Sequence, residues 1–382
     1  MHYDYIIVGA GSVGIPLAYY LGLENQKVLV LEHLPSPGQG NNKAAIGGIR
    51  SSHSEPVKVL LCQETIRIIR EWELQRPDEL EYQAGGYLYV ARREEDLQSF
   101  GVSQEIMKRF NIPAHRLSPS ELPRIVPAIN PDYYRGGLYC PEDINISPLK
   151  SSYAFYLAAR RQGVEFRFNQ TVQAIISDHS RIRNIVTQNE HYTCGTLILA
   201  NGSTIRGLGR KIGLDIPVYP DSHEAGISAP YQSILKTMIV DISPDEEFHS
   251  RNFYFIQNKV GAFIFCYTPY QSLDGTQTTS EFMPVIARRM IRTMPVLKDL
   301  YIRRTWRGSY PNTPDGVPIA DKIQAFENLY VLGGMCGQGV MLGPGLAKNF
   351  SAFILNGSPL IDSSIFARLR FHRRFDQIEL LK

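Results

Sequence analysis

The chain has 382 residues, of which 43% are hydrophobic and 20% are charged, and its formal net charge is +3. This length and composition are typical of an ordinary globular protein with two domains or one large composite domain. The small net charge, without a long run of Lys and Arg, argues against nucleic-acid binding. No apolar run approaches the roughly 20 residues that a transmembrane helix needs.

The cysteines indicate neither a metal site nor a disulfide framework. All five lie far apart, and none forms a Cys-x-x-Cys pair. The first apolar run begins at Tyr5, which leaves no room for a signal peptide, so we expect a cytoplasmic protein. A basic cluster near the C-terminus fits a solvated helical face and consists of Arg368, Arg370, Arg373 and Arg374.

The N-terminal segment has the pattern of a dinucleotide-binding βαβ unit. Residues 5–8 and 28–31 are apolar runs that predict two buried parallel strands, with a helix between them. Between the first strand and the helix, Gly9 allows the tight turn, Gly11 lets a pyrophosphate approach the backbone, and Gly14 lets the helix pack on the strand. The N-terminus of the helix is expected to hold the phosphates, and Glu32, at the end of the second strand, to accept hydrogen bonds from the ribose hydroxyls of an unphosphorylated adenosine. The predicted binding residues of this unit are Gly9, Gly11, Ser12, Val13, Gly14 and Glu32.

A second domain is predicted to begin after the next helix. Residues 56–74 have the apolar spacing of an amphipathic helix, and residues 85–90 alternate like a strand. Residues 93–125 are mostly helical in character. The chain then returns to the first domain, where we predict a helix at 149–162, a strand from Val164 to Val172, a hairpin at 182–193 and a buried strand at 196–200.

The C-terminal half combines an antiparallel region with a second return to the first domain. Residues 216–310 are rich in Tyr, Phe and Thr and alternate like an antiparallel sheet, with a helix near 281–293. A buried strand at 329–332 leads into a glycine-rich loop at 333–339, and the final helix is expected at about 343–356.

Three strands of the first domain are followed directly by glycine-rich turns. These junctions, at 9–14, 200–202 and 333–339, are predicted to lie on one rim of one parallel sheet, where ligands bind. An extended FAD would use all three junctions, whereas NAD needs fewer. We therefore predict a fold of the α/β and α+β classes, in which a discontinuous Rossmann-like FAD-binding domain (1–84, 146–215 and 319–382) carries an antiparallel-sheet substrate domain (85–145 and 216–318).

With these junctions in place, the chain resembles the glycine oxidase, sarcosine oxidase and D-amino acid oxidase superfamily of FAD enzymes over nearly its whole length. It is most similar to the β subunit of heterotetrameric sarcosine oxidases and to dye-linked L-proline dehydrogenases. The segments that carry the resemblance are the glycine fingerprint with Glu32, residues 47–50, Ser147-Pro148, residues 304–308, residues 313–318 and residues 333–339.

The resemblance implies an amine-oxidising flavoenzyme. A hydride leaves the α-carbon of a small amino or N-alkyl amino acid for flavin N5, and the imine product is hydrolysed. Arg50 matches the position that often grips the substrate carboxylate, and His53 could face the same cavity. Tyr254 and Tyr310 match positions over the flavin ring. The remaining residues that the resemblance assigns to FAD are Val172, Ala200, Gly202, Gly334, Gly337, Gln338, Gly339, Val340 and Met341.

Several departures from the family pattern refine these expectations. Where covalent members have a His before the Gly-Gly segment or a Cys before the Thr-Pro-Asp element, this chain has residues 41–43 (Asn-Asn-Lys) and Ser309, so we predict noncovalent FAD. Residues 262–266 lack the Lys that oxygen-using members place over the flavin, which favours another electron acceptor. Met341 replaces a second carboxylate-binding Lys, which favours a small substrate.

Two other interpretations remain open. The substrate could be a 2-hydroxy acid or glycerol 3-phosphate, in which case a base must take the hydroxyl proton and His223 is the candidate. The chain could instead be a flavoprotein subunit of a multi-subunit dehydrogenase that is inactive alone. A partner subunit or a homo-oligomer is compatible with either.

Overall fold

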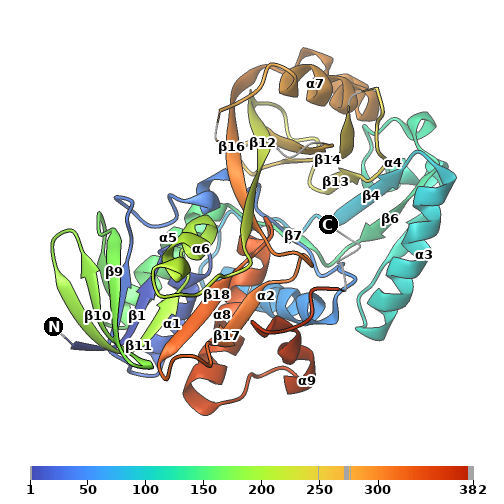
Figure 1. Ribbon diagram of the computed structural model, residues 1–382. Coiled ribbons are helices and arrows are strands. Elements are labelled where there is room, and N and C mark those ends of the chain that lie inside the picture. Colours follow the sequence, from blue (N-terminus) through green and yellow to red (C-terminus); the bar gives the residue numbers. More distant parts are fainter. Residues whose placement is uncertain (1, 248, 271–274, 276, 377–382) are drawn as a thin grey trace.

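Two eight-stranded sheets organise the part of the chain that the computed structural model describes, which is residues 2–247, 249–270, 275 and 277–376 (Figure 1). A two-stranded antiparallel ribbon pairs β3 (Gly48–Ile49) with β7 (Ile144–Asn145). Within these described residues, no helix is both long enough and apolar enough to cross a membrane. Short 3-10 helices lie at Asn41–Ala44 (η1), Pro119–Glu121, Pro131–Tyr133, Gly202–Thr204, Pro295–Asp299 and Ala367–Leu369.

The first sheet has a parallel core with antiparallel additions. Its order is β17-β18-β11-β1-β2-β8, and the hairpin of β9 and β10 extends from β11. The pairs that join β18, β11, β1, β2 and β8 are parallel, whereas β17 is antiparallel to β18. The strands are β1 (His2–Val8), β2 (Val28–Leu31), β8 (Glu165–Arg167), β9 (Val172–Asp178), β10 (Arg181–Thr187), β11 (His191–Leu199), β17 (Ile319–Lys322) and β18 (Leu329–Gly333).

Both faces of this sheet are covered, which explains the continuous apolar runs of β1 and β2. Ile7 and Val30 pack into a core shared with four helices of ten or more residues. Ile6 and Leu29 point to the opposite face, into a core shared with the β9–β10 hairpin and α6 (Ile205–Arg210). The four helices are α1 (Gly14–Leu23), α2 (Pro56–Gln75), α5 (Pro148–Arg161) and α8 (Gly339–Asn356).

The second sheet is antiparallel except for one pair. Its order is β16-β12-β15-β14-β13-β4-β6-β5, and only β13 and β4 run parallel among these strands. The helices α3 (Glu94–Arg109), α4 (Leu122–Ile125) and α7 (Phe282–Thr293) accompany it, and a short helix α9 (Ser363–Phe366) precedes the C-terminal segment. The strands are β4 (Tyr87–Ala91), β5 (His115–Leu117), β6 (Gly136–Cys140), β12 (Tyr219–Pro230), β13 (Met238–Asp241), β14 (Ser250–Gln257), β15 (Ala262–Pro269) and β16 (Ile302–Asn312).

Alternation along these strands separates two faces of the second sheet. Phe253 and Phe265 belong to the face that packs under α7. Tyr254 and Trp306 belong to the opposite face, which packs around Ile46 of the first domain. In register, Tyr254 lies opposite Cys266, Cys266 opposite Ala225, and Ala225 opposite Trp306. Successive side chains on a strand alternate between faces, so this second face forms one continuous surface toward the first sheet.

Three local expectations were wrong. The strand that begins after Val164 ends at Arg167, and Val172 instead starts β9, because the chain leaves the parallel core there to form a hairpin. The last helix begins at Gly339, four residues earlier than predicted. The segment 93–125 is mostly helical, as predicted, and also contains the short strand β5. All five residues of β4 are buried rather than alternating, because both faces of this central strand are covered.

The helix α7 is joined to the sheet by a buried ion pair. The Arg289 guanidinium lies 2.9 Å from the Asp241 carboxylate, and both side chains are fully buried. Arg289 also donates to the Ser250 hydroxyl at 2.7 Å and to the Ser243 carbonyl at 2.9 Å. Burial raises the pKa of Asp241 despite this partner, so the carboxylate depends on Arg289 for compensation.

We predict that Arg289→Met lowers the free energy of unfolding by about 3 kcal/mol, because it leaves the buried Asp241 without its closest cation. The neighbouring Arg288, whose side chain is 61% exposed, provides the control. Arg288→Met should change the free energy of unfolding by less than about 0.5 kcal/mol. Urea denaturation of both variants measures the difference, and equal effects would contradict this assignment.

Candidate active site

The glycine fingerprint forms the tight turn between β1 and α1. Gly9 has φ +113°, and a Cβ there would lie 2.5 Å from the Ala200 carbonyl oxygen. A Cβ on Gly14 would lie 2.0 Å from the Gly9 carbonyl oxygen. A Cβ on Gly11, by contrast, would meet no atom within 4 Å. Two glycines are therefore required by close packing of the chain, and Gly11 borders open space of the kind that a pyrophosphate occupies.

Glu32 lies at the end of β2 beside this turn. Its carboxylate accepts hydrogen bonds from the Ala10 amide at 2.7 Å and from the Leu34 amide at 2.9 Å, and His33 Nδ1 lies 2.8 Å away. A carboxylate offers about four lone-pair positions, so acceptor capacity remains for a ribose. The role of Glu32 toward ribose stays a prediction.

The three glycine junctions meet on one rim, as predicted, because β1, β11 and β18 are parallel neighbours. Buried polar atoms around this rim lack hydrogen-bond partners in the described structure. They are Oδ1 of Asn42 in η1, Oδ1 of Asn201 after β11 and Oε1 of Gln338 after β18. Buried polar atoms normally have partners, so these oxygens and the space at Gly11 fit a long polar ligand such as FAD.

The loop after β18 brings α8 close to the fingerprint. Gly334, Cys336 and Gly337 have positive φ values of 70°, 50° and 76°. A Cβ on Gly343 would lie 2.1 Å from the Ser12 carbonyl oxygen, and one on Gly339 would lie 2.6 Å from the Ser12 hydroxyl. The loop and the start of α8 therefore form one wall of the rim. Val340 is buried and Met341 half-buried on the first turn of α8.

The second sheet contributes a tyrosine pair directly above this loop. The Tyr254 and Tyr310 hydroxyls lie 3.0 Å apart. The Tyr310 ring fills the place of a Gly337 side chain, since a Cβ on that glycine would lie 2.2 Å from it. Burial raises the pKa of both phenols, so both remain protonated at neutral pH. The structure thus brings the two predicted tyrosines together at the glycine-rich loop after β18.

His223 belongs to the same group. Its ring stacks on Tyr310 with centroids 3.9 Å apart, and its Nε2 lies 3.7 Å from the Asp221 carboxylate. Its Nδ1 is buried without a hydrogen-bond partner among the described residues. His223 is therefore placed with Tyr254 and Tyr310 rather than in a separate core.

Arg50 follows the ribbon strand β3 and is buried. Its guanidinium donates to the Ser52 carbonyl oxygen. The Tyr87 hydroxyl packs on Gly48, where a Cβ would lie 1.7 Å from it, so the segment before Arg50 lies under the aromatic face of the second sheet. The predicted carboxylate-binding role of Arg50 stays a prediction.

His53 is fully buried against α2 rather than open to solvent. Its Nε2 lies 3.5 Å from the Cys62 sulfur, and its Nδ1 has no hydrogen-bond partner in the described residues. Burial, with the charges of Arg50 and Lys58, lowers the pKa of the imidazole well below its usual value, so the ring is neutral. A catalytic role for His53 remains untested.

The other predicted cofactor residues lie in or near the first sheet. Ala200 follows β11, and Gly202 turns the chain with φ +59°. Val172 is buried at the start of β9, in the core that also contains Val8 and Leu31. The described His, Cys, Asp and Glu side chains form no group of three or more that could hold a metal ion, and the sequence predicts no metal site.

Sequence reasoning missed Asp143, which is fully buried beside the Arg50 segment. It accepts from the Ser51 amide at 2.8 Å and from the Ser52 hydroxyl at 3.2 Å. The available signal was an acid four residues before Ser147-Pro148, where the chain is predicted to return to the first domain.

The interpretation of the C-terminal arginines as a solvated face was wrong for two of them, Arg368 and Arg373. Arg373 donates to both oxygens of the fully buried Asp315, at 2.8 and 2.9 Å, and to the Val317 carbonyl oxygen at 2.6 Å. Arg368 lies 3.5 Å from Asp315 and 3.3 Å from Glu55. The C-terminal segment therefore fixes the turn 313–318.

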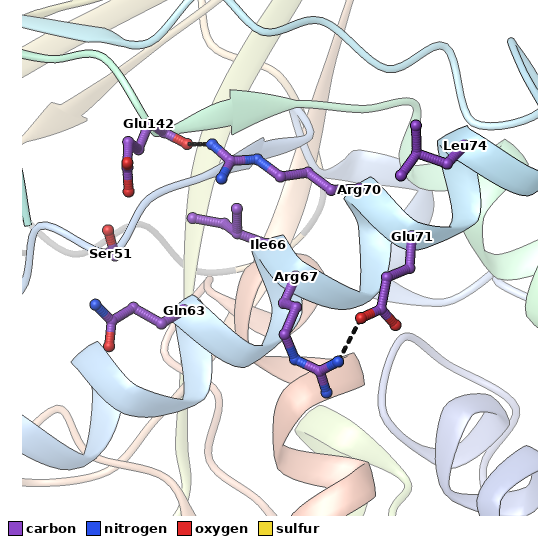
Figure 2. A pocket seen from close by; sticks show the side chains of 8 residues that line it. All are labelled: Ser51, Gln63, Ile66, Arg67, Arg70, Glu71, Leu74 and Glu142. Atoms are coloured by element: carbon purple, nitrogen blue, oxygen red, sulfur yellow. Dashed lines mark hydrogen bonds and ion pairs between the residues drawn. The ribbon is translucent and has the colours of Figure 1, made fainter.

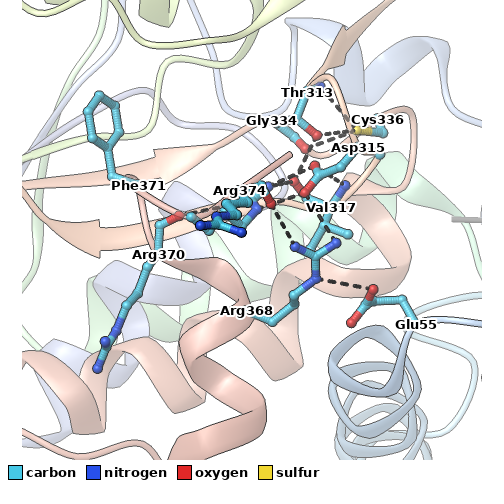
Figure 3. A network of polar contacts seen from close by, with 12 residues as sticks. Glu55, Thr313, Asp315, Val317, Gly334, Cys336, Arg368, Arg370, Phe371 and Arg374 are labelled. Carbon is cyan, nitrogen blue, oxygen red and sulfur yellow. Dashed lines mark hydrogen bonds and ion pairs between the residues drawn. The ribbon is translucent and has the colours of Figure 1, made fainter. Parts of the chain in front are cut away.

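The turn 313–318 also contacts the glycine-rich loop after β18. The Thr313 hydroxyl donates to the Val317 carbonyl oxygen at 2.8 Å, and the Thr313 amide lies 3.4 Å from the Cys336 sulfur. Figure 3 shows this continuous network from Glu55 through Asp315 to Cys336. Arg370 and Arg374 are exposed, as the sequence predicted, but neither lies in a helix.

Comparison with known proteins decides the family. A family model described as FAD dependent oxidoreductase matches residues 4–352. The chain belongs to this family. FAD is therefore its cofactor, and the residues around the rim fit it.

Individual relatives are distant in sequence. The chain is 24% identical to sarcosine oxidase subunit beta of Rhizobium meliloti, over 98% of this chain and 89% of that protein. It is 22% identical to 4-methylaminobutanoate oxidase of Paenarthrobacter nicotinovorans, over 97% of this chain but only 46% of that protein, so it spans less than half of that relative. The crystal structure of L-proline dehydrogenase from P. horikoshii superposes with a TM-score of 0.88 at 22% identity, covering 97% of this chain and 99% of that one. This likeness shows the shared fold.

We predict that Gly11→Ala folds with unchanged stability but loses most of its FAD, because the methyl group enters the open space without meeting protein. Gly14→Ala should destabilise the protein itself, because its Cβ would overlap the Gly9 carbonyl. Thermal unfolding of the apoprotein and the ratio of flavin to protein separate the two variants. FAD retention by Gly11→Ala would exclude the proposed pyrophosphate position.

We also predict that Arg373→Met costs about 3 kcal/mol of unfolding free energy near neutral pH, since it leaves Asp315 buried and poorly compensated. Burial alone would raise the pKa of Asp315, but the hydrogen bonds and charge of Arg373 hold it below its usual value. The pair therefore stabilises the fold above about pH 4, and this contribution is lost as the pH falls through the lower folded pKa. Urea titrations should show the penalty shrinking in acid, with Arg374→Met as a near-neutral control.

Proposed function

We propose that the chain is an FAD-dependent amine dehydrogenase or oxidase whose substrate is a small amino acid or N-alkyl amino acid. The observation that carries the proposal is the buried Arg50 on a segment packed under the aromatic face that holds Tyr254 and Tyr310. A cation on one side and paired hydroxyls on the other suit a molecule with a carboxylate at one end and an amine near it.

FAD, when bound, accepts a hydride from the carbon that bears the amine, which gives an imine that water hydrolyses. The chain's own residues orient the substrate for that step. A guanidinium binds a carboxylate through two hydrogen bonds, a contact that a point-charge ammonium cannot make. Arg50 would thereby fix the α-carbon, and small errors in such positioning are costly to the rate.

The tyrosine pair would hold the amine end. One of the Tyr254 and Tyr310 hydroxyls donates to the other, so the pair retains one proton and free lone pairs for a ligand. Because both phenols stay protonated, they add no negative charge that would favour a protonated amine. The neutral amine is the reactive form, since its lone pair stabilises the positive charge that develops as hydride leaves.

The names of the relatives support an amine substrate. Sarcosine oxidase subunit beta, 4-methylaminobutanoate oxidase and L-proline dehydrogenase are all named for amines that also carry a carboxylate. Because one of these is a subunit, we also propose that a partner subunit can complete this enzyme. The Ser309 hydroxyl lies 2.8 Å from the Ser203 hydroxyl, which accepts from Asn41. Since these positions lack the attaching Cys and His, we propose that FAD is bound noncovalently.

A specific observation keeps a hydroxy acid as the second candidate. His223 stacks on Tyr310, has an Asp221 carboxylate 3.7 Å away and leaves its Nδ1 without a partner among the described residues. An imidazole beside a carboxylate is the arrangement expected of a base that takes a hydroxyl proton. Under this alternative the histidine would be indispensable, whereas an amine substrate needs no such base.

The test is anaerobic bleaching of the flavin absorption band by candidate substrates. Glycine, sarcosine, proline and other small amino acids form one group, and lactate, 2-hydroxyglutarate and glycerol 3-phosphate form the other. We expect bleaching by an amine, and Arg50→Gln should raise the concentration for half-maximal rate about 100-fold, as for loss of a charged hydrogen-bonded contact.

His223→Gln serves as the matched control. The flavin of this variant should bleach with the same amine at a rate within about tenfold of the native enzyme, because an amine substrate does not need His223 as a base. Loss of a required general base would instead slow bleaching by roughly 10²–10⁴-fold. Bleaching by hydroxy compounds alone, abolished in His223→Gln, would replace the first proposal with the second.

A further inference from the structure

Asp143 is a buried carboxyl that the proposed chemistry does not use. It lies in the turn between β6 and β7, and its side chain is fully buried. One oxygen accepts from the Ser51 amide at 2.8 Å and from the Ser51 hydroxyl at 3.2 Å, and the other accepts from the Ser52 hydroxyl at 3.2 Å. These donors belong to the two residues that follow Arg50, so Asp143 and Arg50 are fixed by the same short segment.

The charges of the two residues oppose each other. The Arg50 guanidinium, which donates to the Ser52 carbonyl, lies close enough to lower the pKa of Asp143 by its charge. Burial outweighs that charge and the hydrogen bonds, and it raises the pKa of Asp143 to about 6. Above that pH the two residues carry no net charge, and below it the positive charge of Arg50 is no longer offset.

The other groups around Asp143 do not titrate in the same range. The phenols and the thiol that face it have raised pKa values because they are buried, and the neutral His53 beside Arg50 has a lowered one. Those facing groups are Tyr87 and Tyr89 from β4 and Tyr139 and Cys140 from β6.

Solvent lies close to this network on its outer side. Ser51 lines a surface pocket of about 190 Å³ along α2, together with Glu142 (Figure 2). Two arginines and two glutamates surround that pocket, and Arg67 is paired there with Glu71. Asp143 is thus hydrogen-bonded to one residue that lines this surface pocket, Ser51, and follows another, Glu142, in the sequence.

We propose that Asp143 is a positioning and specificity-determining residue that sets the net charge of the Arg50 site. When ionised, it holds the Ser51–Ser52 segment in place and offsets Arg50, so that the site accepts one carboxylate and disfavours a second. When neutral, it leaves Arg50 with a full positive charge and the site binds anions more tightly. The inference rests on the proposed role of Arg50 and assigns the substrate to the monocarboxylic class.

The test measures the affinity of the FAD-loaded enzyme for acetate between about pH 5.5 and pH 8. Calorimetry and the change in the flavin absorption spectrum report the binding. The native enzyme should bind acetate about tenfold more tightly at the acid end, because protonation of Asp143 removes a negative charge that opposes an anion. Asp143→Asn should bind acetate at the alkaline end about as tightly as the native enzyme does in acid, with no dependence on pH.

Two controls, an uncharged ligand and a substitution at a neighbouring residue, separate an effect of charge on binding from an effect on the structure of the site. Acetamide, which has no charge, should bind equally to the native enzyme and to Asp143→Asn at every pH. Glu142→Gln, a change at the exposed neighbouring residue, should leave both ligands unaffected. Weaker binding of both ligands to Asp143→Asn would mean that Asp143 has a structural role only, and would overturn the inference.

Two further outcomes keep the test decisive. If Asp143→Asn does not fold, the native enzyme still decides, because acetate affinity that is independent of pH overturns the inference. If Arg50→Gln binds acetate as well as the native enzyme, the role of Arg50 fails and the proposed function with it. If Arg50→Gln binds weakly and Asp143→Asn binds no tighter than native, only the role of Asp143 fails.

Discussion

The rest of this molecule depends on close backbone approach at the rim of the first sheet. A Cβ on Gly9, Gly14 or Gly343 would lie between 2.0 and 2.5 Å from a carbonyl oxygen. Side chains at these positions would therefore separate β1 from β11, or α1 and α8 from the fingerprint turn. Gly11, in the same turn, is the exception, because the space beside it is open. Tight packing around one open position is what makes the turn a phosphate site rather than a simple connection.

The second sheet is tied to that rim by contacts of the same kind. The Tyr310 ring lies on Gly337, the Tyr87 hydroxyl lies on Gly48, and the Trp306 indole donates to the Ala44 carbonyl at 3.1 Å. These contacts hold the face that carries Tyr254 against the segments around Ala44, Gly48 and Gly337. Arg50 and Asp143 are fixed by one short segment, because Asp143 accepts hydrogen bonds from Ser51 and Ser52.

Much of this could be predicted from the sequence, because the decisive signals are local. The fingerprint needs only its own spacing of glycines and apolar runs, and alternation was enough to predict the antiparallel sheet whose strands carry Tyr254 and Tyr310. Their expected place over the flavin came from the family resemblance. Other features depend on distant partners. Arg373 looks like a surface residue until Asp315, 58 positions away, is placed beside it. The surroundings of Asp143 become visible only when Ser51 and Ser52 are placed beside it. Val172 does not extend the preceding strand, because it begins the hairpin of β9 and β10.

The central claim is that Arg50 binds the carboxylate of an amine substrate between its own segment and the tyrosine pair. A crystal structure of the FAD-loaded enzyme with a bound unreactive carboxylate, such as acetate or pyrrole-2-carboxylate, tests it most directly. The account predicts carboxylate oxygens within hydrogen-bonding distance of the Arg50 guanidinium, with the rest of the ligand directed toward Tyr254 and Tyr310. A carboxylate held by the exposed Arg304, or by any other cation with Arg50 out of reach, would contradict it.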